Sequence, residues 1–279
     1  MLVLLQLLNV LLPLGYLLAV VVYLALYTTG APWTARAATG VARGVVATHF
    51  GYLLLATLVF AHVPVANVWE AFSFLAFALA TVYLVLEWRL QNQATGVFLL
   101  ARALFFQVVS SAFVTHTSEV EPILRSSWFG LHVTAALLGY AAFAIAAVYG
   151  LLYLLLYRTL KGHRIGLIFE RLPSLEILGK LNLSALIFGW GNLTLAIVIG
   201  MVWVTGLESS GQLAGNFLAD PAFLSATVVW VLYSICLGGR YALQWPSRYL
   251  AGISLVTFGL LLASSFVVNL VVDSFHSFG

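Results

Sequence analysis

The chain has 279 residues, of which 63% are hydrophobic and only 8% are charged. A soluble globular domain carries about 25% charged residues, so this composition excludes an ordinary soluble fold. Each helical crossing of a bilayer needs roughly 20 apolar residues, so the length allows about eight to ten crossings and no separate soluble domain. The apolar runs are continuous and do not alternate with polar residues, which excludes a transmembrane β-barrel. The composition therefore predicts an all-α polytopic protein with the lipid bilayer as its partner.

Taken in chain order, the apolar runs predict eight membrane spans within a single membrane domain, residues 1–279. The spans cover approximately residues 2–28, 45–61, 67–88, 95–115, 128–157, 181–205, 221–237 and 249–272. A turn at residues 62–66 separates the second span from the third, because Pro64 cannot continue the helix before it. Asn67 is predicted to cap the third span, and Glu70 to reach back to the cap as in a capping box. The single cysteine, Cys236, is expected to pack inside a span.

The few charges are sorted by side. Eleven of the twelve basic residues lie in or beside the first, third, fifth and seventh connections: Arg36, Arg43, Arg89, Arg102, Arg158, Lys161, Arg164, Arg171, Lys180, Arg240 and Arg248. Only Arg125 falls on the other side. By the positive-inside rule these connections face the cytoplasm, so both termini are predicted to face outward. We expect a bacterial cytoplasmic membrane. Basic residues scattered over short connections favour no nucleic-acid partner.

Histidines are the residues with evident ligand chemistry, and there are six of them. On the predicted topology four lie at the outer face, namely His62, His116, His132 and His276, whereas His163 lies in the basic fifth connection. His49 lies about one turn inside the second span. Neutral imidazole is the usual protein ligand of haem iron, and two imidazoles on opposite faces of the porphyrin complete a six-coordinate site. Histidines at helix ends, such as His132 and His276, are candidates for such a pair, and ordinary headgroup contacts are the alternative.

His132 lies one turn after Trp128, above a stripe of small residues spaced by three or four. The stripe consists of Ala135, Gly139, Ala142, Ala146 and Gly150. Such a stripe indicates either close helix packing or space for a flat ligand, and the sequence leaves both open. Near the C-terminus, Asn269, Asp273 and His276 share one helical face. Asp273 is then placed to accept the second ring N–H of His276 and to fix its tautomer.

Catalytic motifs are missing from the sequence. There is no nucleophile and base pair, metalloprotease motif, glycine-rich phosphate loop or pair of carboxylates at catalytic spacing. The Gly189-Trp190-Gly191 segment is expected only to let helices approach closely. We therefore expect no enzymatic activity.

Three stretches of the sequence carry a family resemblance. Residues 64–70, with Pro64, Asn67 and Glu70, are similar to a P-x-x-N-x-x-E motif at a helix start. Trp128 to Val133 with Leu138-Gly139-Tyr140 are similar to W-x-x-x-H-V and L-G-Y, and His276-Ser277-Phe278-Gly279 to H-S-[FY]-G. In order and spacing they resemble the cytochrome c assembly family, specifically its CcsA/HemX branch. The segments 172–176 and 181–182 resemble the HemX side.

This resemblance implies a haem-handling function in cytochrome c biogenesis. It implies that His132 and His276 are axial ligands of haem iron at the outer face, with Trp128 and Asp273 beside the cofactor. Haem-handling members also carry a tryptophan-rich outer loop, whereas residues 206–221 contain no tryptophan. Synthase members have an inner histidine where Gly238 stands here, and His49 is the candidate replacement. These departures imply a HemX-like member without haem lyase activity.

Two other functions remain open. One is a non-catalytic subunit of a larger membrane complex, in which this chain no longer binds haem. The altered loop at 206–221 supports this alternative. The other is a regulatory anchor whose basic loop at 158–180 binds a soluble enzyme of tetrapyrrole biosynthesis. A basic loop beside a membrane span also serves as a topology determinant and as a contact for anionic lipid.

Overall fold

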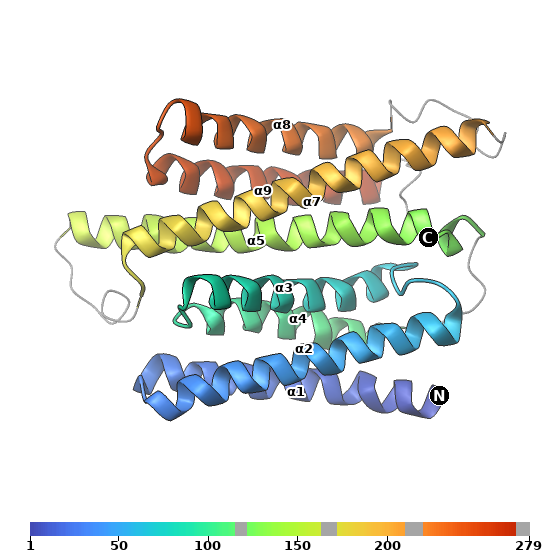
Figure 1. Cartoon of the computed structure of the whole chain (residues 1–279), viewed down its shortest axis with the longest axis horizontal. Helices are drawn as coiled ribbons and strands as arrows, with labels where there is room; N and C mark the ends of the chain where they lie inside the picture. Colours follow the sequence, from blue (N-terminus) through green and yellow to red (C-terminus); the bar gives the residue numbers. More distant parts are fainter. Residues whose placement is uncertain (115–121, 163–171, 210–219, 272–279) are drawn as a thin grey trace. The chain divides into compact units, whose positions relative to one another are not determined.

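The computed structural model describes residues 1–114, 122–162, 172–209 and 220–271. Within these ranges eight helices are long and apolar enough to cross a membrane, and no strand is present (Figure 1). They are α1 (Leu2–Thr29), α2 (Pro32–Phe60), α3 (Val68–Leu90), α4 (Gly96–Phe113), α5 (Ser127–Lys161), α7 (Leu175–Ser209), α8 (Pro221–Ala242) and α9 (Ser247–Val271). A short 3₁₀ helix, η1 (Pro122–Arg125), precedes α5. The predicted all-α integral membrane fold with eight spanning helices is confirmed.

Several helices are longer than the apolar runs that predicted them. Helix α2 begins at Pro32, whereas its apolar run begins at Val45. Arg36 and Arg43 interrupt the run but not the helix, and proline is favoured in a first helical turn. Helices α5 and α7 have 35 residues each. At a rise of about 1.5 Å per residue each is about 52 Å long, which exceeds a hydrocarbon core of about 30 Å. The spanning segments are therefore only parts of these helices.

Helix starts are set by side chains that accept backbone N–H groups. The Oδ1 atom of Asn67 accepts the N–H of Glu70 at 2.9 Å, as predicted for the start of α3. The carboxylate of Glu70 accepts the N–H of Ala66 at 2.9 Å, one residue before the cap that the sequence indicated. At α8, Asp220 accepts the N–H groups of Ala222 and Phe223. These bonds satisfy donors that the helix itself leaves unpaired.

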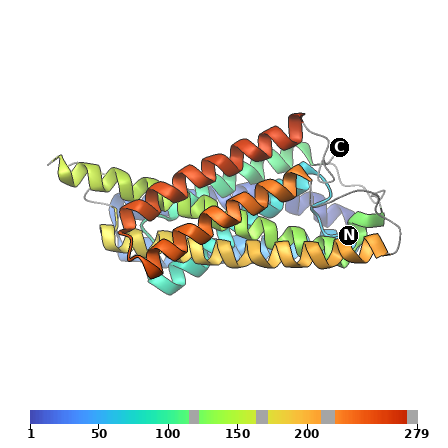
Figure 2. The same cartoon turned by 90° about the horizontal axis from the view of Figure 1, so that it is seen from above.

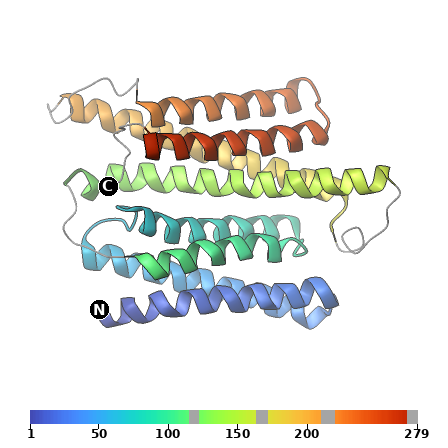
Figure 3. The same ribbon diagram turned by 180° about the vertical axis from the view of Figure 1, so that it is seen from behind.

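The chain divides into two compact units. The first consists of residues 1–126 and 164–174 and contains α1 to α4, and the second consists of residues 127–163 and 175–279 and contains α5, α7, α8 and α9. In the first unit α1 packs on α2 and α4, and α3 packs on α4 and α2 (Figure 3). In the second unit α7 packs along α5, and α8 and α9 form a hairpin whose α9 contacts α5 (Figure 2). A single membrane domain over residues 1–279 stays a prediction.

Two connections of the first unit lie at the same end of it. Gln93, between α3 and α4, donates from Nε2 to the carbonyl oxygen of Ala35 at 3.1 Å and to Oγ1 of Thr39 at 2.6 Å. Ala35 and Thr39 are in the first turns of α2. Arg36 and Arg89 therefore share one end of this unit, as the charge pattern requires. The side of the membrane that this end faces stays a prediction.

The small residues of α5 serve close helix packing. A methyl group at Gly139 would lie 3.2 Å from the carbonyl oxygen of Gly189, and one at Gly150 only 2.6 Å from that of Ala251. Ala142 and Ala146, between them, are fully buried. The backbones of α7 and α9 thus occupy the space along the stripe, so the packing interpretation is confirmed and the flat-ligand interpretation is wrong. Gly189 has the role predicted for it.

Candidate functional site

His132 is the predicted ligand that the structure describes. It is the sixth residue of α5 and is half-buried, and its Nδ1 lies 2.8 Å from the carbonyl oxygen of Ala196 on α7. A carbonyl oxygen can only accept, so Nδ1 carries a ring hydrogen, and in the neutral imidazole the lone pair is then on Nε2. A backbone carbonyl that fixes the imidazole in this way is the usual partner of a metal-ligating histidine. The arrangement suits His132 to bind a metal through Nε2.

Gly200 on α7 makes room for this imidazole. A methyl group at Gly200 would lie 2.8 Å from Nδ1 and 2.9 Å from Cε1 of His132. Contacts under 3.0 Å require one group to move, and the ring is held by Ala196. Neither Gly200 nor Ala196 was identified from the sequence, because only the packing of α5 on α7 brings them to His132.

Aromatic side chains lie along the helix turns next to His132. Trp128 is 48% exposed, and the ring of Phe129 lies 5.8 Å from that of Trp203, between centroids. Trp203 is three residues beyond Gly200 on α7. Trp203 was not selected as a site residue from the sequence. Its position near the outer end of the span predicted at 181–205 was the one signal that could have identified it. Amphipathic aromatic residues are typical of the membrane–water interface, which agrees with a site at a helix end.

His276 and Asp273, the other predicted site residues, lie outside the described residues. The register of α9 on α5 is set by Ala251 against Gly150 and by Asn182, which donates to Ala146 O at 2.7 Å and to Ser254 Oγ at 2.9 Å. This antiparallel register, extended at about 1.5 Å per residue, brings about residue 269 level with His132. The described part of α9 therefore ends at the end of the second unit that holds His132.

The side chain of His49 is hydrogen-bonded inside the first unit. It is fully buried, and its Nδ1 lies 2.9 Å from the hydroxyl of Tyr16 while its Nε2 lies 3.0 Å from Oγ of Ser73. Because both ring nitrogens already have protein partners, the structure does not support His49 as a replacement haem ligand. Ser73 donates onward to Oε1 of Gln107 at 3.1 Å.

This hydrogen-bond chain continues across the first unit. Gln107 donates to Ser111 Oγ at 3.0 Å, and Ser111 donates to the carbonyl oxygen of Asn9 at 2.9 Å. The chain therefore links α1, α2, α3 and α4 through neutral polar groups. Polar bonds of this kind hold helices together where lipid supplies no hydrophobic drive. We therefore assign a structural role to this series of hydrogen bonds.

Glu87, near the end of α3, is a buried carboxylate that no sequence motif singled out. It is 5% exposed, and its carboxylate accepts the hydroxyls of Tyr23 at 2.5 Å, Tyr83 at 2.6 Å and Thr39. Tyr83 precedes Glu87 by four residues, which was the one local signal. The other two hydroxyl donors, Tyr23 and Thr39, come from α1 and α2. Three hydroxyl donors replace the water that this carboxylate loses on burial.

The other histidines add no metal site in the described parts of the chain. His62 is 3% exposed, and its Nδ1 lies 2.9 Å from the carbonyl oxygen of Val63. His116 and His163 lie outside the described residues. Among the residues that are described, no three or more His, Cys, Asp or Glu gather in a group that could hold a metal ion. Cys236 is buried and unpaired by disulfide, as expected.

The fold and this site define a class: an integral membrane protein of eight apolar helices with an oriented histidine near a helix end. The family model described as "Cytochrome C assembly protein" matches residues 65–276, which is most of the chain. The chain belongs to the cytochrome c assembly protein family. The predicted family is confirmed.

Relatives in this family come from plastid-bearing algae, cyanobacteria and other bacteria. The chain is 24% identical to the cytochrome c biogenesis protein CcsA of Mesostigma viride over 242 residues, which cover 78% of both chains. It is 29% identical to protein HemX of Brevibacillus brevis over 215 residues, or 76% of both chains. It is 23% identical to CcsA of Synechococcus elongatus over 262 residues, or 77% of this chain and 79% of that one. The similarity therefore extends over most of each protein and includes both CcsA and HemX.

Proposed function

We propose that this protein binds and handles haem in cytochrome c biogenesis. The single observation that carries the proposal is the bond from Nδ1 of His132 to the carbonyl oxygen of Ala196, which directs the lone pair of the ring to Nε2. The membership in the cytochrome c assembly family supports the biogenesis role. The names of relatives such as CcsA of Mesostigma viride point in the same direction.

In this proposal His132 is one axial ligand of haem iron and His276 is the other. The register of α9 on α5, which ends the described part of α9 near the level of His132, supports a pairing at one end of the second unit. Two imidazoles would supply both axial positions of haem iron. Trp128 lies one turn from His132 and is partly exposed, so it is placed to contact the ring edge. Asp273 would hold the second nitrogen of His276.

The proposed role is binding without catalysis. Residues 206–221 contain no tryptophan, so the platform that presents haem to an apocytochrome in other members is missing from the sequence. Affinity then comes from the two imidazoles and the apolar surroundings, and the location of the site at one face decides which compartment exchanges haem. Coexpression with an apocytochrome c should give no covalently bound haem, measured by peroxidase staining of a denaturing gel.

The haem proposal is tested by the absorption spectrum of the purified full chain. Haem added to the protein in neutral detergent should give a Soret band and the split visible bands of low-spin six-coordinate iron. The double variant His132→Ala, His276→Ala should lose this spectrum, and each single variant should give a five-coordinate one. His49→Leu serves as the matched control, because it removes a histidine of the first unit. An unchanged spectrum in the double variant would falsify the ligand assignment.

A further inference from the structure

Two pockets adjoin each other on the first unit, between α2, α3 and the connection that follows α3. The first has a volume of about 370 Å³ and is lined by Ala35, Arg36, Thr39, Gly40, Arg43 and Gln93. The second has a volume of about 260 Å³ and is lined by Arg43, Val46, Thr81, Leu84, Val85 and Trp88. Arg43 lines both of them. The first pocket has two arginines, a threonine and a glutamine among its six lining residues, whereas the second is lined mainly by apolar residues.

The two arginines of the first pocket carry charge that the described protein does not neutralise. Arg36 and Arg43 are both exposed, and among the residues that the structure describes neither forms an ion pair with an acid. The nearby carboxylate of Glu87 is occupied by the hydroxyls of Tyr23, Tyr83 and Thr39. The planar guanidinium group of arginine can donate two parallel hydrogen bonds to the oxygens of a phosphate. An anion bound here would therefore neutralise the positive charge of Arg36 and Arg43.

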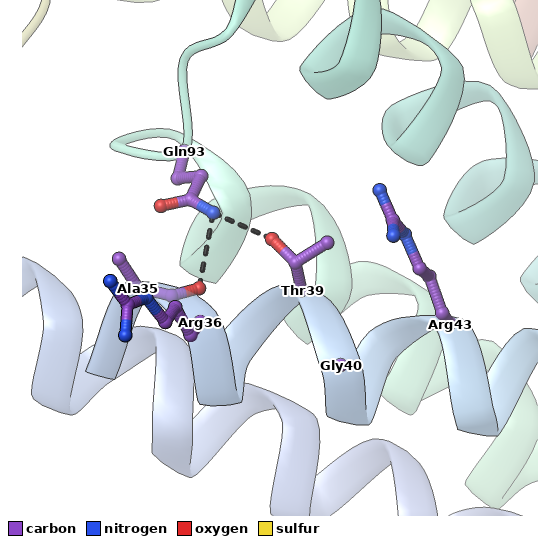
Figure 4. A pocket seen from close by; sticks show the side chains of 6 residues that line it. All are labelled: Ala35, Arg36, Thr39, Gly40, Arg43 and Gln93. Atoms are coloured by element: carbon purple, nitrogen blue, oxygen red, sulfur yellow. Dashed lines mark hydrogen bonds between the residues drawn. The ribbon is translucent and has the colours of Figure 1, made fainter. Parts of the chain in front are cut away.

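The centre of the pocket is held in place by hydrogen bonds. Figure 4 shows Thr39 on α2 between Arg36 and Arg43, with the amide of Gln93 above it. That amide donates to Thr39 and to the carbonyl oxygen of Ala35. Gly40 leaves the helix surface open, because a methyl group there would meet nothing within 4 Å. The α2 surface at Thr39 and Gly40 is therefore held in place by hydrogen bonds and open to a ligand, with Arg36 and Arg43 on either side of Thr39.

Tryptophans at this end of the unit indicate the level of lipid headgroups. Trp33 in the first turn of α2 is 71% exposed, and Trp88 in the last turns of α3 is 66% exposed. Exposed tryptophan is concentrated at membrane–water interfaces. From Arg36 to Arg43 and on to Val46, α2 runs away from this level, and α3 runs toward it from Thr81 to Trp88. The apolar pocket therefore lies deeper along the helices than the basic one.

We propose that the two pockets together bind one anionic phospholipid. Its phosphate lies against Arg43, at the junction of the pockets, and Arg36 contacts the rest of the headgroup. One acyl chain follows the second pocket, against Val46, Leu84 and Val85. A basic pocket that continues into an apolar groove matches the charged headgroup and the acyl chain of a phospholipid. A free phosphate would contact only the basic pocket. Thr81 also lines the second pocket, and its hydroxyl, buried without a hydrogen-bond partner among the described residues, is the donor left for an ester carbonyl.

Native mass spectrometry of the full chain in neutral detergent tests this binding. The protein is incubated with equal concentrations of phosphatidylglycerol and phosphatidylcholine, and the lipid that remains bound is counted. We expect one phosphatidylglycerol per chain, retained at least tenfold more strongly than phosphatidylcholine. The double variant Arg36→Gln, Arg43→Gln should lose this preference. Equal retention of both lipids by the unaltered protein, or undiminished preference in the double variant, overturns the proposal.

Arg89→Gln is the matched control for charge. Arg89 is exposed near the same end of the first unit but lines neither pocket. Its replacement should leave the retained phosphatidylglycerol unchanged, and a loss equal to that of the double variant would show that only overall charge matters. Arg43→Lys keeps the charge and removes the fork, so it should weaken retention several-fold. Circular dichroism and elution volume verify that each variant is folded.

Two further arms distinguish a phospholipid from a free phosphate. Val85 is 40% exposed, and Val85→Trp should fill the apolar groove while both arginines remain. We expect this variant to retain at least tenfold less phosphatidylglycerol than the unaltered protein. We also expect millimolar inorganic phosphate to displace none of the lipid from the unaltered protein. Undiminished retention of phosphatidylglycerol by Val85→Trp, or its displacement from the unaltered protein by millimolar inorganic phosphate, identifies a phosphate site and overturns the phospholipid assignment.

Discussion

The Nδ1 atom of His132 on α5 lies 2.8 Å from the carbonyl oxygen of Ala196 on α7. The two residues are 64 positions apart in the chain, so this bond exists only because α5 and α7 pack antiparallel along their length. It fixes one tautomer of the imidazole and one orientation of its ring. The ring of His132 is thereby oriented, as the rings of metal-ligating histidines are by a hydrogen bond from the second nitrogen.

Gly200→Ala should weaken haem binding although it replaces neither proposed ligand. The added methyl group meets the His132 ring at 2.8 Å, so the ring must leave the carbonyl oxygen of Ala196. Loss of such a supporting bond typically costs about 10- to 100-fold in metal affinity. Titration of haem by its Soret absorbance measures the effect. Gly191→Ala is the control on the same helix, since a methyl group there meets nothing within 4 Å, and equal weakening in both variants would contradict the stated cause.

His49→Leu should destabilise the protein and leave haem binding intact. The change removes one buried hydrogen bond from the Tyr16 hydroxyl and one from Ser73 Oγ, while Tyr16 keeps its longer contact with Ala76 O and Ser73 its bond to Gln107. Each hydrogen bond of this kind contributes about 0.5–1.5 kcal/mol. Thermal unfolding in detergent, followed by circular dichroism, should show a lower midpoint. A lost Soret band at a temperature where the variant remains folded would mean that His49 contacts the cofactor.

Glu87→Gln should lower stability more than a surface change of the same kind. The carboxylate accepts two tyrosine hydroxyls on Oε2 and the Thr39 hydroxyl on Oε1, whereas glutamine keeps one acceptor oxygen and places an NH₂ group in the other position. We expect a loss of about 1–3 kcal/mol in the free energy of unfolding. Glu176→Gln is the comparison, because its pair with Lys180 at 2.7 Å is exposed to water, which screens the attraction. Chemical unfolding in mixed micelles compares the two, and equal losses would refute the burial explanation.

Asp220→Ala should destabilise α8 through loss of its cap. The Asp220 carboxylate accepts the N–H groups of Ala222 at 3.0 Å and Phe223 at 3.1 Å. Removal of such a cap costs about 0.5–2 kcal/mol, and Asp220→Asn should recover most of it because the amide oxygen also caps. Hydrogen exchange of the first turns of α8 reports the change directly. If the asparagine variant exchanged as fast as the alanine variant, charge and not capping would be responsible.

Local patterns predicted much of the fold. Continuous apolar runs gave the eight helices, and Asn67 with Glu70 marked the start of α3 before any contact was known. Helix ends were less predictable where polar residues continue a helix past the apolar run, as Arg36 and Arg43 do in α2. The Asp220-Pro221 pair was an available signal for the start of α8, because a capping residue followed by proline favours a helix start.

The sequence by itself determined the class of protein, the number of helices, the sorting of charge between the two sets of connections and the choice of His132 as a candidate ligand. These follow from composition and from spacing along one helix, which need no knowledge of neighbours. Only the tertiary structure decided that His132 is oriented by Ala196 and accommodated by Gly200, and that both nitrogens of His49 are occupied within the protein. It also decided that Glu87 is enclosed by hydroxyls and that Arg36 and Arg43 lie beside an apolar groove. These properties depend on which side chains from distant helices meet, and helix packing alone fixes that.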